Sequence, residues 1–267
     1  MTNLKIATFN VNSINARLEN FTSWLKECDP DIVLVQEIKS QLDNFPFMDI
    51  KFAGYDAKIL GQKSYNGVAI ISKHKIEITE ENLPNFEDEQ KRYLEALIEV
   101  EGEKIRVATI YAPNGNPPYN DPNDKSKFEY KLKWTEALYS HAKKLLNKQE
   151  ICILGGDYNT ILTPKDAYDI SKFKNDALYQ PETIQRFKAI ENLGYYDAYK
   201  ALHPKENAFT YWDYANSAFI QDWGIRIDYL MLSPMAIDRL KKCYVDKSPR
   251  GKTKPSDHTA LICEIEV

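Results

Sequence analysis

The 267-residue sequence predicts a single α/β domain that is built on mixed β-sheets. Short apolar strand patterns are interrupted by helical patterns at uneven intervals, and two of the strands are close enough in sequence to form a hairpin. No internal repeat and no low-complexity linker divides the chain. We therefore expect one domain over residues 1–267, with parallel and antiparallel strands in the same sheets.

The first 35 residues predict two strands around one helix. Leu4–Phe9 has a strand pattern, and Ile32–Val35 is a continuous apolar run that is typical of a buried strand. Between them, Asp29-Pro30 is expected to end a helix. The apolar residues with helical spacing are Ile14, Leu18, Phe21 and Leu25.

The rest of the chain predicts more strands and two more helices. The strand patterns cover Gly67–Ser72, Leu94–Val100, Lys104–Tyr111, Ile151–Leu154, Ile227–Leu232 and Leu261–Val267. Glu101-Gly102-Glu103 is expected to form the hairpin turn between Leu94–Val100 and Lys104–Tyr111. Gly155-Gly156 is expected to end the strand Ile151–Leu154. After a loop rich in Pro and Asn, one amphipathic helix is expected to end near Leu146, and a second to run from Glu182 to Leu193.

The charge balance gives no global sign of nucleic-acid binding. The net charge is −4 and the isoelectric point is near 5.7. A local basic face or a bound cation can still attract a phosphate backbone, so these values do not exclude DNA.

The four cysteines and the N-terminus bear on the compartment. The cysteines form no CxxC pair, which argues against structural zinc, and a chain of this length needs no disulfide, so we expect reduced, buried thiols. The start MTNLKIATFN lacks a signal-peptide pattern, and no segment approaches the roughly 18 apolar residues of a membrane span. We expect a cytoplasmic protein without membrane contact.

Polar side chains follow or precede four of the strand patterns. A turn is the ordinary interpretation of any one of these clusters, but four clusters of one chemical kind indicate a shared site. Their oxygen ligands suit Mg²⁺, with Mn²⁺ as a substitute, better than zinc. The clusters are Asn10 with Asn12, Gln36-Glu37, Asp157 with Asn159, and Asp257-His258.

His258 is the natural candidate for charge stabilisation or proton transfer. Such a histidine needs a carboxylate to hold its tautomer, and Asp228 is a candidate. An equally good interpretation from sequence alone is that Asp228 pairs with Arg226 at the start of a strand.

Six motifs in this chain, taken together, resemble those of the exonuclease III type abasic-site endonucleases, within the endonuclease/exonuclease/phosphatase superfamily. They appear in family order over nearly the whole chain. The motifs are Thr8-Phe9-Asn10-Val11-Asn12, Val35-Gln36-Glu37, Ile110-Tyr111-Ala112-Pro113-Asn114-Gly115, Gly156-Asp157-Tyr158-Asn159, Gly224-Ile225-Arg226-Ile227-Asp228-Tyr229 and Pro255-Ser256-Asp257-His258.

The resemblance implies a DNase I-like fold, a four-layer αββα sandwich of two mixed sheets with helices on both outer faces. It implies a metal site formed by Asn10, Glu37, Asp157, Asn159, Asp257 and His258, with Glu37 as the main ligand. The catalytic groups it implies are Tyr111, Asp157, Asn159, Asp228 and His258. The DNA-binding groups it implies are Asn12, Asn114, Phe209, Trp212, Trp223 and Ile225.

The activity that the resemblance implies is Mg²⁺-dependent DNA repair. The enzyme would incise double-stranded DNA 5′ to abasic sites and remove 3′-terminal nucleotides or blocking groups, acting as a monomer. Asp157 is our choice for the general base, and His258 is the alternative. A phosphoesterase for a lipid or small-molecule phosphate, or an inactive DNA-binding relative, remains open.

Substrate choice is expected to depend on the stretch from Phe209 to Ile225. By the resemblance, Phe209, Trp212 and Ile225 wall an apolar pocket for a base-less deoxyribose. The chain departs from the family at Gln221-Asp222-Trp223, where relatives carry basic residues. An Asp there should weaken backbone attraction, whereas Trp223 could stack on an exposed base. Cations that could offset the loss are Lys91, Arg92, Lys247, Arg250, Lys252 and Lys254.

Overall fold

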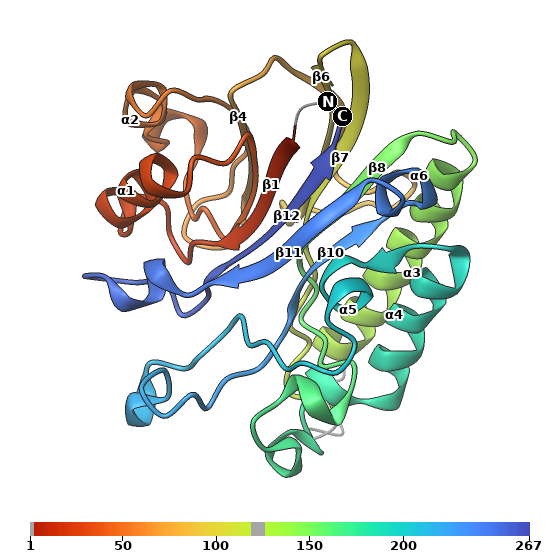
Figure 1. Ribbon diagram of the computed structural model, residues 1–267. Coiled ribbons are helices and arrows are strands. Elements are labelled where there is room, and N and C mark those ends of the chain that lie inside the picture. Colours follow the sequence, from red (N-terminus) through yellow and green to blue (C-terminus); the bar gives the residue numbers. More distant parts are fainter. Residues whose placement is uncertain (1–2, 119–125) are drawn as a thin grey trace.

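The computed structural model describes residues 3–118 and 126–267, which fold into two packed sheets with helices outside them (Figure 1). The strands are β1 (Asn3–Asn10), β2 (Ile32–Gln36), β3 (Asp56–Leu60), β4 (Val68–Ser72), β5 (Ile76–Glu81), β6 (Tyr93–Val100), β7 (Glu103–Tyr111), β8 (Ile151–Asp157), β9 (Tyr196–Asp197), β10 (Asp228–Leu232), β11 (Leu240–Asp246) and β12 (Ala260–Glu266). The α-helices are α1 (Leu18–Cys28), α2 (Phe47–Phe52), α3 (Ser126–Leu146), α4 (Pro181–Leu193), α5 (Ala198–Leu202) and α6 (Pro234–Ile237).

Each sheet has six strands and is mixed, as the sequence predicts. The first has the order β11-β12-β1-β2-β4-β3 and the second β5-β6-β7-β8-β10-β9. The central pairs, β1 with β2 and β7 with β8, are parallel, and the neighbouring pairs are antiparallel. The two termini lie side by side because Asn3 on β1 is paired with Glu266 on β12.

Three apolar layers separate the sheets and helices. Between the sheets, apolar side chains of β1 and β2 meet those of β7, β8 and β10. Helix α1 covers the outer face of the first sheet with Phe21 and Trp24, while Trp134 of α3 and Phe187 of α4 cover the second. In Figure 1, α1 and α2 therefore lie on one side of the sheets and α3 and α4 on the other. The αββα prediction is confirmed.

The predicted end of β8 is wrong, and the reason is the packing of the two sheets. The strand continues through Gly155 and Gly156 to Asp157. A Cβ on Gly155 would come within 2.6 Å of Leu34 in the opposite sheet, and one on Gly156 within 1.9 Å of the Ile110 carbonyl oxygen. The glycines permit this close approach inside the strand, so they do not end it.

Helix α1 is also shorter than predicted. Ile14 lies before α1, and its N–H is bonded to the Ile38 carbonyl. Asp29 ends α1 in the left-handed conformation, with a φ of 51°, directly before Pro30.

The strand patterns did not reveal the four edge strands, β3, β5, β9 and β11. Their side chains are mostly partly exposed, so the continuous apolar run that revealed β2 and β8 is missing. All four cysteines are free, as expected, and three of them are buried. None of the described helices combines the length and apolarity that a membrane crossing requires.

Candidate active site

The polar clusters meet at one edge of the sheets because of strand direction. Strands β1, β2, β7 and β8 end at this edge, and the antiparallel strands β10 and β12 begin there. Asp157 is therefore in register with both Tyr111 on β7 and Asp228 on β10. Groups that are far apart in sequence become neighbours around a cavity of about 640 Å³.

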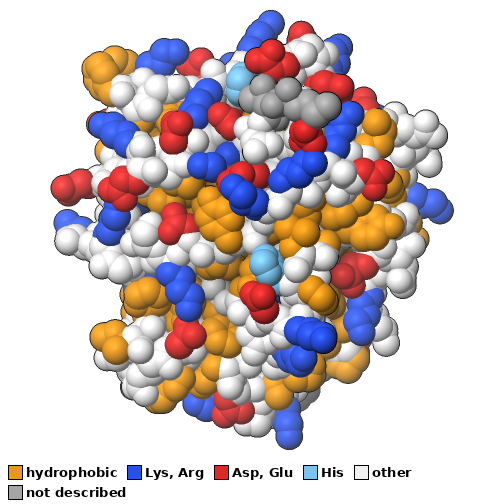
Figure 2. Space-filling view, viewed as in Figure 1, with side chains coloured by type: hydrophobic (Ala, Val, Ile, Leu, Met, Phe, Trp, Pro, Cys, Tyr) orange, Lys and Arg blue, Asp and Glu red, His pale blue; other side chains and the backbone are white. Residues whose placement is uncertain are grey.

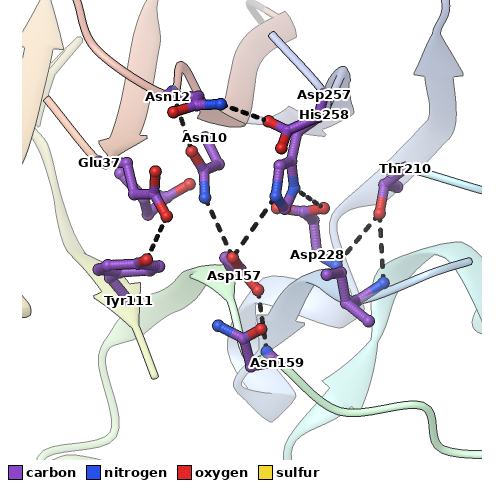
Figure 3. Close-up of polar contacts among 12 residues, drawn as sticks. Asn10, Asn12, Glu37, Tyr111, Asp157, Asn159, Thr210, Asp228, Asp257 and His258 are labelled. Carbon is purple, nitrogen blue, oxygen red and sulfur yellow. Dashed lines mark hydrogen bonds and ion pairs between the residues drawn. The ribbon is translucent and has the colours of Figure 1, made fainter. Parts of the chain in front are cut away.

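Three buried side chains form the centre of the site (Figure 3). His258 Nδ1 is 2.9 Å from Asp228 Oδ2, and its Nε2 is 3.7 Å from Asp157 Oδ2. The imidazole thus lies between two carboxylates. Thr210 fixes the backbone of Asp228, since its hydroxyl oxygen accepts the Asp228 N–H at 3.2 Å. The predicted His258–Asp228 contact is present.

The alternative in which Asp228 pairs with Arg226 is wrong. The Arg226 guanidinium instead donates to Asp166 at 2.7 Å and to Asp197 at 2.5 Å, and all three groups are buried. This ion-paired arginine connects the segments around Asp166 and Asp197. Asp228 is therefore free to bond His258.

Burial affects Asp157 and His258 in opposite directions. Burial raises the pKa of Asp157 to about 7, although the positive charge of His258 opposes the shift. Burial would lower the pKa of His258, but the Asp228 carboxylate outweighs it and raises that pKa to about 10. Near neutral pH, the imidazole is therefore protonated, and Asp157 exchanges a proton easily.

Glu37 lies across the cavity from this centre and contacts two donors. Tyr111 donates its hydroxyl to Glu37 Oε1, and Lys39 Nζ is 3.0 Å from Oε2. Burial disfavours the carboxylate charge, but these two donors outweigh it and lower the Glu37 pKa. Burial and the neighbouring Glu37 raise the pKa of Tyr111, so its hydroxyl stays neutral and can donate.

The amide side chains connect these groups. Asn10 Nδ2 donates to Asp157 Oδ2 at 3.0 Å, and Asn12 Nδ2 donates to Asp257 Oδ1 at 3.0 Å. The Asn12 carbonyl oxygen in turn accepts Lys39 Nζ at 2.6 Å. Carboxylates from opposite ends of the chain are thus held in one network.

The loop after β8 turns back toward the loop after β7. The Asn159 N–H donates to Asp157 Oδ1 at 2.9 Å, and its side-chain amide donates to the Ala112 carbonyl at 2.9 Å. Asn114 Nδ2 lies 3.3 Å from Asn159 Oδ1. Both predicted asparagines line the cavity.

The backbone is left-handed at three of the site residues. The φ angles are 45° at Asn12, 52° at Glu37 and 47° at Asn159. A positive φ is uncommon for a glutamate and costs conformational energy, which the surrounding hydrogen bonds must offset. The strained residues lie just after the ends of strands β1, β2 and β8, where a change of backbone direction turns their side chains toward the site.

The apolar wall of the cavity differs from the prediction. Of the three predicted wall residues, only Ile225 lines it. Trp212 is fully buried and donates its indole N–H to Asp222, while Phe209 lines a separate hollow. Besides Tyr111, the cavity is lined by the aromatic residues Tyr168, Phe173, Tyr211 and Trp223.

Trp223 forms the outer part of this wall. It is 38% exposed and lies nearly parallel to Tyr168, with ring centroids 5.9 Å apart and an interplanar angle of 15°. Lys172 Nζ lies over both rings. This chain therefore presents an aromatic pair with one associated cation at the rim.

The basic cluster before Asp257 mostly serves internal contacts. Lys247 pairs with Asp222 at 2.9 Å, Lys252 pairs with Glu27 at 2.6 Å, and Arg250 donates to the Trp212 carbonyl. Arg92 is likewise buried against Tyr111. These four cations therefore do not form a free basic surface, and Asp222 is neutralised by Lys247. On the face shown in Figure 2, positive and negative side chains are interspersed.

Sequence reasoning missed Lys39, Lys131 and Thr210 at the site. Lys39 follows Glu37 by two residues, so its place in the same motif was an available signal. Thr210 directly follows Phe209, in the stretch that was expected to select the substrate, but nothing there indicated a bond to Asp228. Lys131 lies on a helix far in sequence from the predicted site residues, and the sequence carried no sign of its role.

The donor atoms fit a hard cation. Asp157, Asp228 and His258 offer ligand atoms within 4.8 Å of one another. A protonated imidazole has no free lone pair, however, so His258 fits a hydrogen-bond donor better than a ligand. On the other side of the cavity, the oxygens of Glu37 and Asn12 converge on the Lys39 ammonium, which shows that this part of the site attracts positive charge.

Comparison with known proteins agrees with this geometry. Residues 7–258 match the model of the Endonuclease/Exonuclease/phosphatase family. The chain is 27% identical to "Exodeoxyribonuclease III" of Haemophilus influenzae over 274 residues, which cover 98% of this chain and 100% of that protein.

Two solved structures share the fold at higher identity. An AP endonuclease from Archaeoglobus fulgidus is 34% identical, with a TM-score of 0.90, over 99% of this chain and 100% of the other. A 3′ phosphatase from Neisseria, NExo, bound to a product DNA hairpin, is 32% identical, with a TM-score of 0.92, over the same shares.

Proposed function

Because the chain belongs to the Endonuclease/Exonuclease/phosphatase family, we propose that it is a DNA repair phosphodiesterase. It incises double-stranded DNA 5′ to abasic sites and removes 3′-terminal nucleotides or blocking groups. The observation that carries this proposal is the buried arrangement of Asp157, His258 and Asp228 beside an open cavity. The exodeoxyribonuclease, endonuclease and phosphatase names of the relatives support the substrate class.

Asp157 and His258 divide the proton transfers of hydrolysis between them. Asp157, with its pKa raised to about 7, accepts the proton of the attacking water. His258 is protonated and donates to a phosphoryl oxygen as charge builds there. Asp228 keeps the imidazole oriented and charged. The raised pKa of His258 argues against its role as the base.

Tyr111 and the asparagines position the substrate. The Tyr111 hydroxyl stays neutral and contacts the scissile phosphate or the leaving oxygen. Asn159 places the attacking water beside Asp157. Asn114 and Asn12 contact the phosphate backbone of the DNA and position it. These amides are donors that cost no reorganisation when the charge develops.

The family is metal-dependent, and we propose Mg²⁺, with Mn²⁺ as a substitute. Glu37 is the main ligand, with oxygens of Asn10, Asp257, Asp157 and Asn159 near it. When bound, the ion neutralises charge on the phosphoryl oxygens. The Lys39 ammonium holds Glu37 and the Asn12 carbonyl together, so the carboxylate is already aimed into the cavity.

DNA is recognised beside the catalytic centre. Ile225, with Tyr211, forms the apolar wall for a base-less sugar, and Trp223 stacks on a base at the rim. Phe209 and Trp212 support this wall from behind and do not line the cavity. We propose that the protein acts as a monomer.

Mg²⁺-dependent nicking of a duplex that carries a tetrahydrofuran abasic analogue tests the proposal. We expect cleavage 5′ to the analogue and release of phosphate from a 3′-phosphate end. Glu37→Gln should abolish the metal stimulation, while binding to the same duplex in EDTA survives. Turnover of an inositol phosphate or a phospholipid headgroup without DNA cleavage would favour a small-molecule phosphoesterase. DNA binding without any turnover would favour an inactive relative.

A further inference from the structure

Lys131 is a buried cation directly beneath the active site. It lies in the first half of α3, on the face that packs against the second sheet, and only 1% of it is exposed. Its Nζ donates to the Asn159 carbonyl at 2.5 Å and to the Asn114 carbonyl at 3.1 Å. No carboxylate forms an ion pair with it among residues 3–118 and 126–267.

The two carbonyls belong to the loops that carry the positioning amides. Asn114 follows β7 and Asn159 follows β8, and the two side chains also contact each other at 3.3 Å. The Asn159 N–H is bonded to Asp157 Oδ1 at 2.9 Å. A shift of the Asn159 backbone would therefore also shift the Asp157 carboxylate, the proposed general base.

Gly115 shows how closely the first loop rests on this lysine. Its φ is 84°, and a Cβ there would lie 2.7 Å from Lys131 Cδ. The loop after β7 thus packs on the aliphatic part of Lys131 while the ammonium holds the carbonyl of the preceding residue. The Lys131 side chain therefore holds this loop in place through both an apolar contact and a hydrogen bond.

A purely structural role would not require a charge at this position. The other buried residues on the same face of α3, such as Trp134 and Leu138, are mostly apolar. Burial without a directly bonded carboxylate is costly for an ammonium. The two carbonyl bonds offset part of this cost, and the negative charges of Asp157 and Asp176 favour the ammonium from a greater distance.

We propose that Lys131 is a positioning residue for the phosphodiesterase reaction. Through the carbonyls of Asn114 and Asn159, it holds both asparagine amides and the Asp157 carboxylate in the geometry that in-line attack requires. This inference rests on the proposed function, since it names the reaction that the positioned groups serve.

The test compares Lys131→Met with Lys133→Met, an exposed lysine on the same helix. With the tetrahydrofuran duplex and saturating Mg²⁺, Lys131→Met should lower kcat by about 100-fold, because small misplacements of reacting groups cost that much. The KM, the melting temperature and the DNA affinity in EDTA should change little. Lys133→Met should match the wild type, and Lys131→Arg, which keeps two donors, should recover part of the loss.

Side-chain amide NMR of Asn114 and Asn159 separates this inference from the proposed function. In Lys131→Met both amide signals should shift or broaden, whether or not the wild type cleaves DNA. A folded Lys131→Met variant with unchanged kcat and unchanged amide signals would overturn the inference. If that variant does not fold, Lys131→Gln, which removes the charge and shortens the side chain, is measured in the same way with the same two outcomes.

Discussion

Two buried clusters in this protein each join a histidine to a carboxylate; the first opens to the cavity of about 640 Å³, and in the second the carboxylate is surrounded by donors. The first contains Asp157, His258 and Asp228 at the edge of the sheets. The second contains Glu95 on β6 and His141 on α3. The residue types are similar, so the difference between the clusters shows which features make such a group reactive.

The charge of the buried Glu95 carboxylate is stabilised by four hydrogen-bond donors. The carboxylate accepts from the Tyr93 hydroxyl at 2.6 Å, the Thr79 hydroxyl at 2.8 Å, Arg106 at 2.6 Å and His141 at 2.6 Å. Burial would raise its pKa, but these donors outweigh burial and lower the pKa to about 2. Such a group stays charged and holds β6, β7 and α3 together.

Asp157 is compensated only in part. It accepts from Asn10 and from the Asn159 N–H, and the nearest cation, His258, is 3.7 Å away and shared with Asp228. Burial therefore dominates, and the pKa rises to about 7. A carboxylate with unsatisfied affinity for a proton is suited to catalysis, whereas a saturated one contributes to stability.

The first test of this comparison is Asp157→Asn, with the largest expected effect on rate. We expect kcat to fall by about 100- to 10,000-fold, the range for the loss of a general base. The free energy of unfolding should change by only about 1 kcal/mol, because relief of the buried charge offsets the lost hydrogen bond. Single-turnover kinetics and chemical denaturation measure the two effects. A large loss of stability with full activity would reverse the roles of the clusters.

Glu95→Gln should have the opposite result. Removing one partner of a buried ion pair leaves Arg106 with a single carboxylate, Glu150 at 2.5 Å, so unfolding should become easier by about 3 kcal/mol, the lower end of the range for such a loss. The folded fraction should keep its kcat. In the wild type, the lowered pKa stabilises the fold above about pH 4.5, and this contribution is lost as the pH falls toward 2. Urea denaturation between pH 7 and pH 3 should show the loss for the wild type and a flatter dependence for the variant.

The pH profile of kcat gives a third, intermediate effect. The rate should rise as Asp157 loses its proton near pH 7 and fall as His258 loses its proton near pH 10. Saturating Mg²⁺ should move the rising limb to lower pH. Asp228→Asn removes the carboxylate that raises the His258 pKa, so the falling limb should move to lower pH. A falling limb that stays in place would show that His258 is not the group that must be protonated.

The smallest expected effect concerns the rim of the open cluster. Trp223→Ala should weaken binding to an abasic duplex by about 1–3 kcal/mol, the contribution of one stacked base, with kcat nearly unchanged. Ile220→Ala, which removes an exposed side chain of the same loop, is the matched control. Fluorescence anisotropy in EDTA measures both affinities. Equal affinities for the two variants would place the base contact elsewhere.

The sequence patterns predicted one domain with mixed sheets and the set of groups at their edge, whereas the αββα layering was implied only by the resemblance to the family. Continuous apolar runs marked β2 and β8, and polar residues at strand ends marked Glu37, Asp157 and His258. These signals are local in sequence, so no three-dimensional information was needed. Edge strands such as β11 lacked them because one side of each faces solvent.

Tertiary structure decided how each group behaves. The sequence could not show that Asp228 joins His258 while Arg226 turns to Asp166 and Asp197. Nor could it show that Trp212 faces the core while Trp223 faces the cavity. In each case, the outcome depends on a partner from another strand or loop, and only packing brings the two together.

The order of residues along the chain tells which chemical groups this protein has and which strand each of them follows. The packed fold is needed to see that the Glu95 carboxylate is saturated, that Asp157 is left basic, and that a buried lysine on α3 supports the loops of the site. Proton affinity depends on burial and on neighbours within a few ångströms, and the chain order does not specify either.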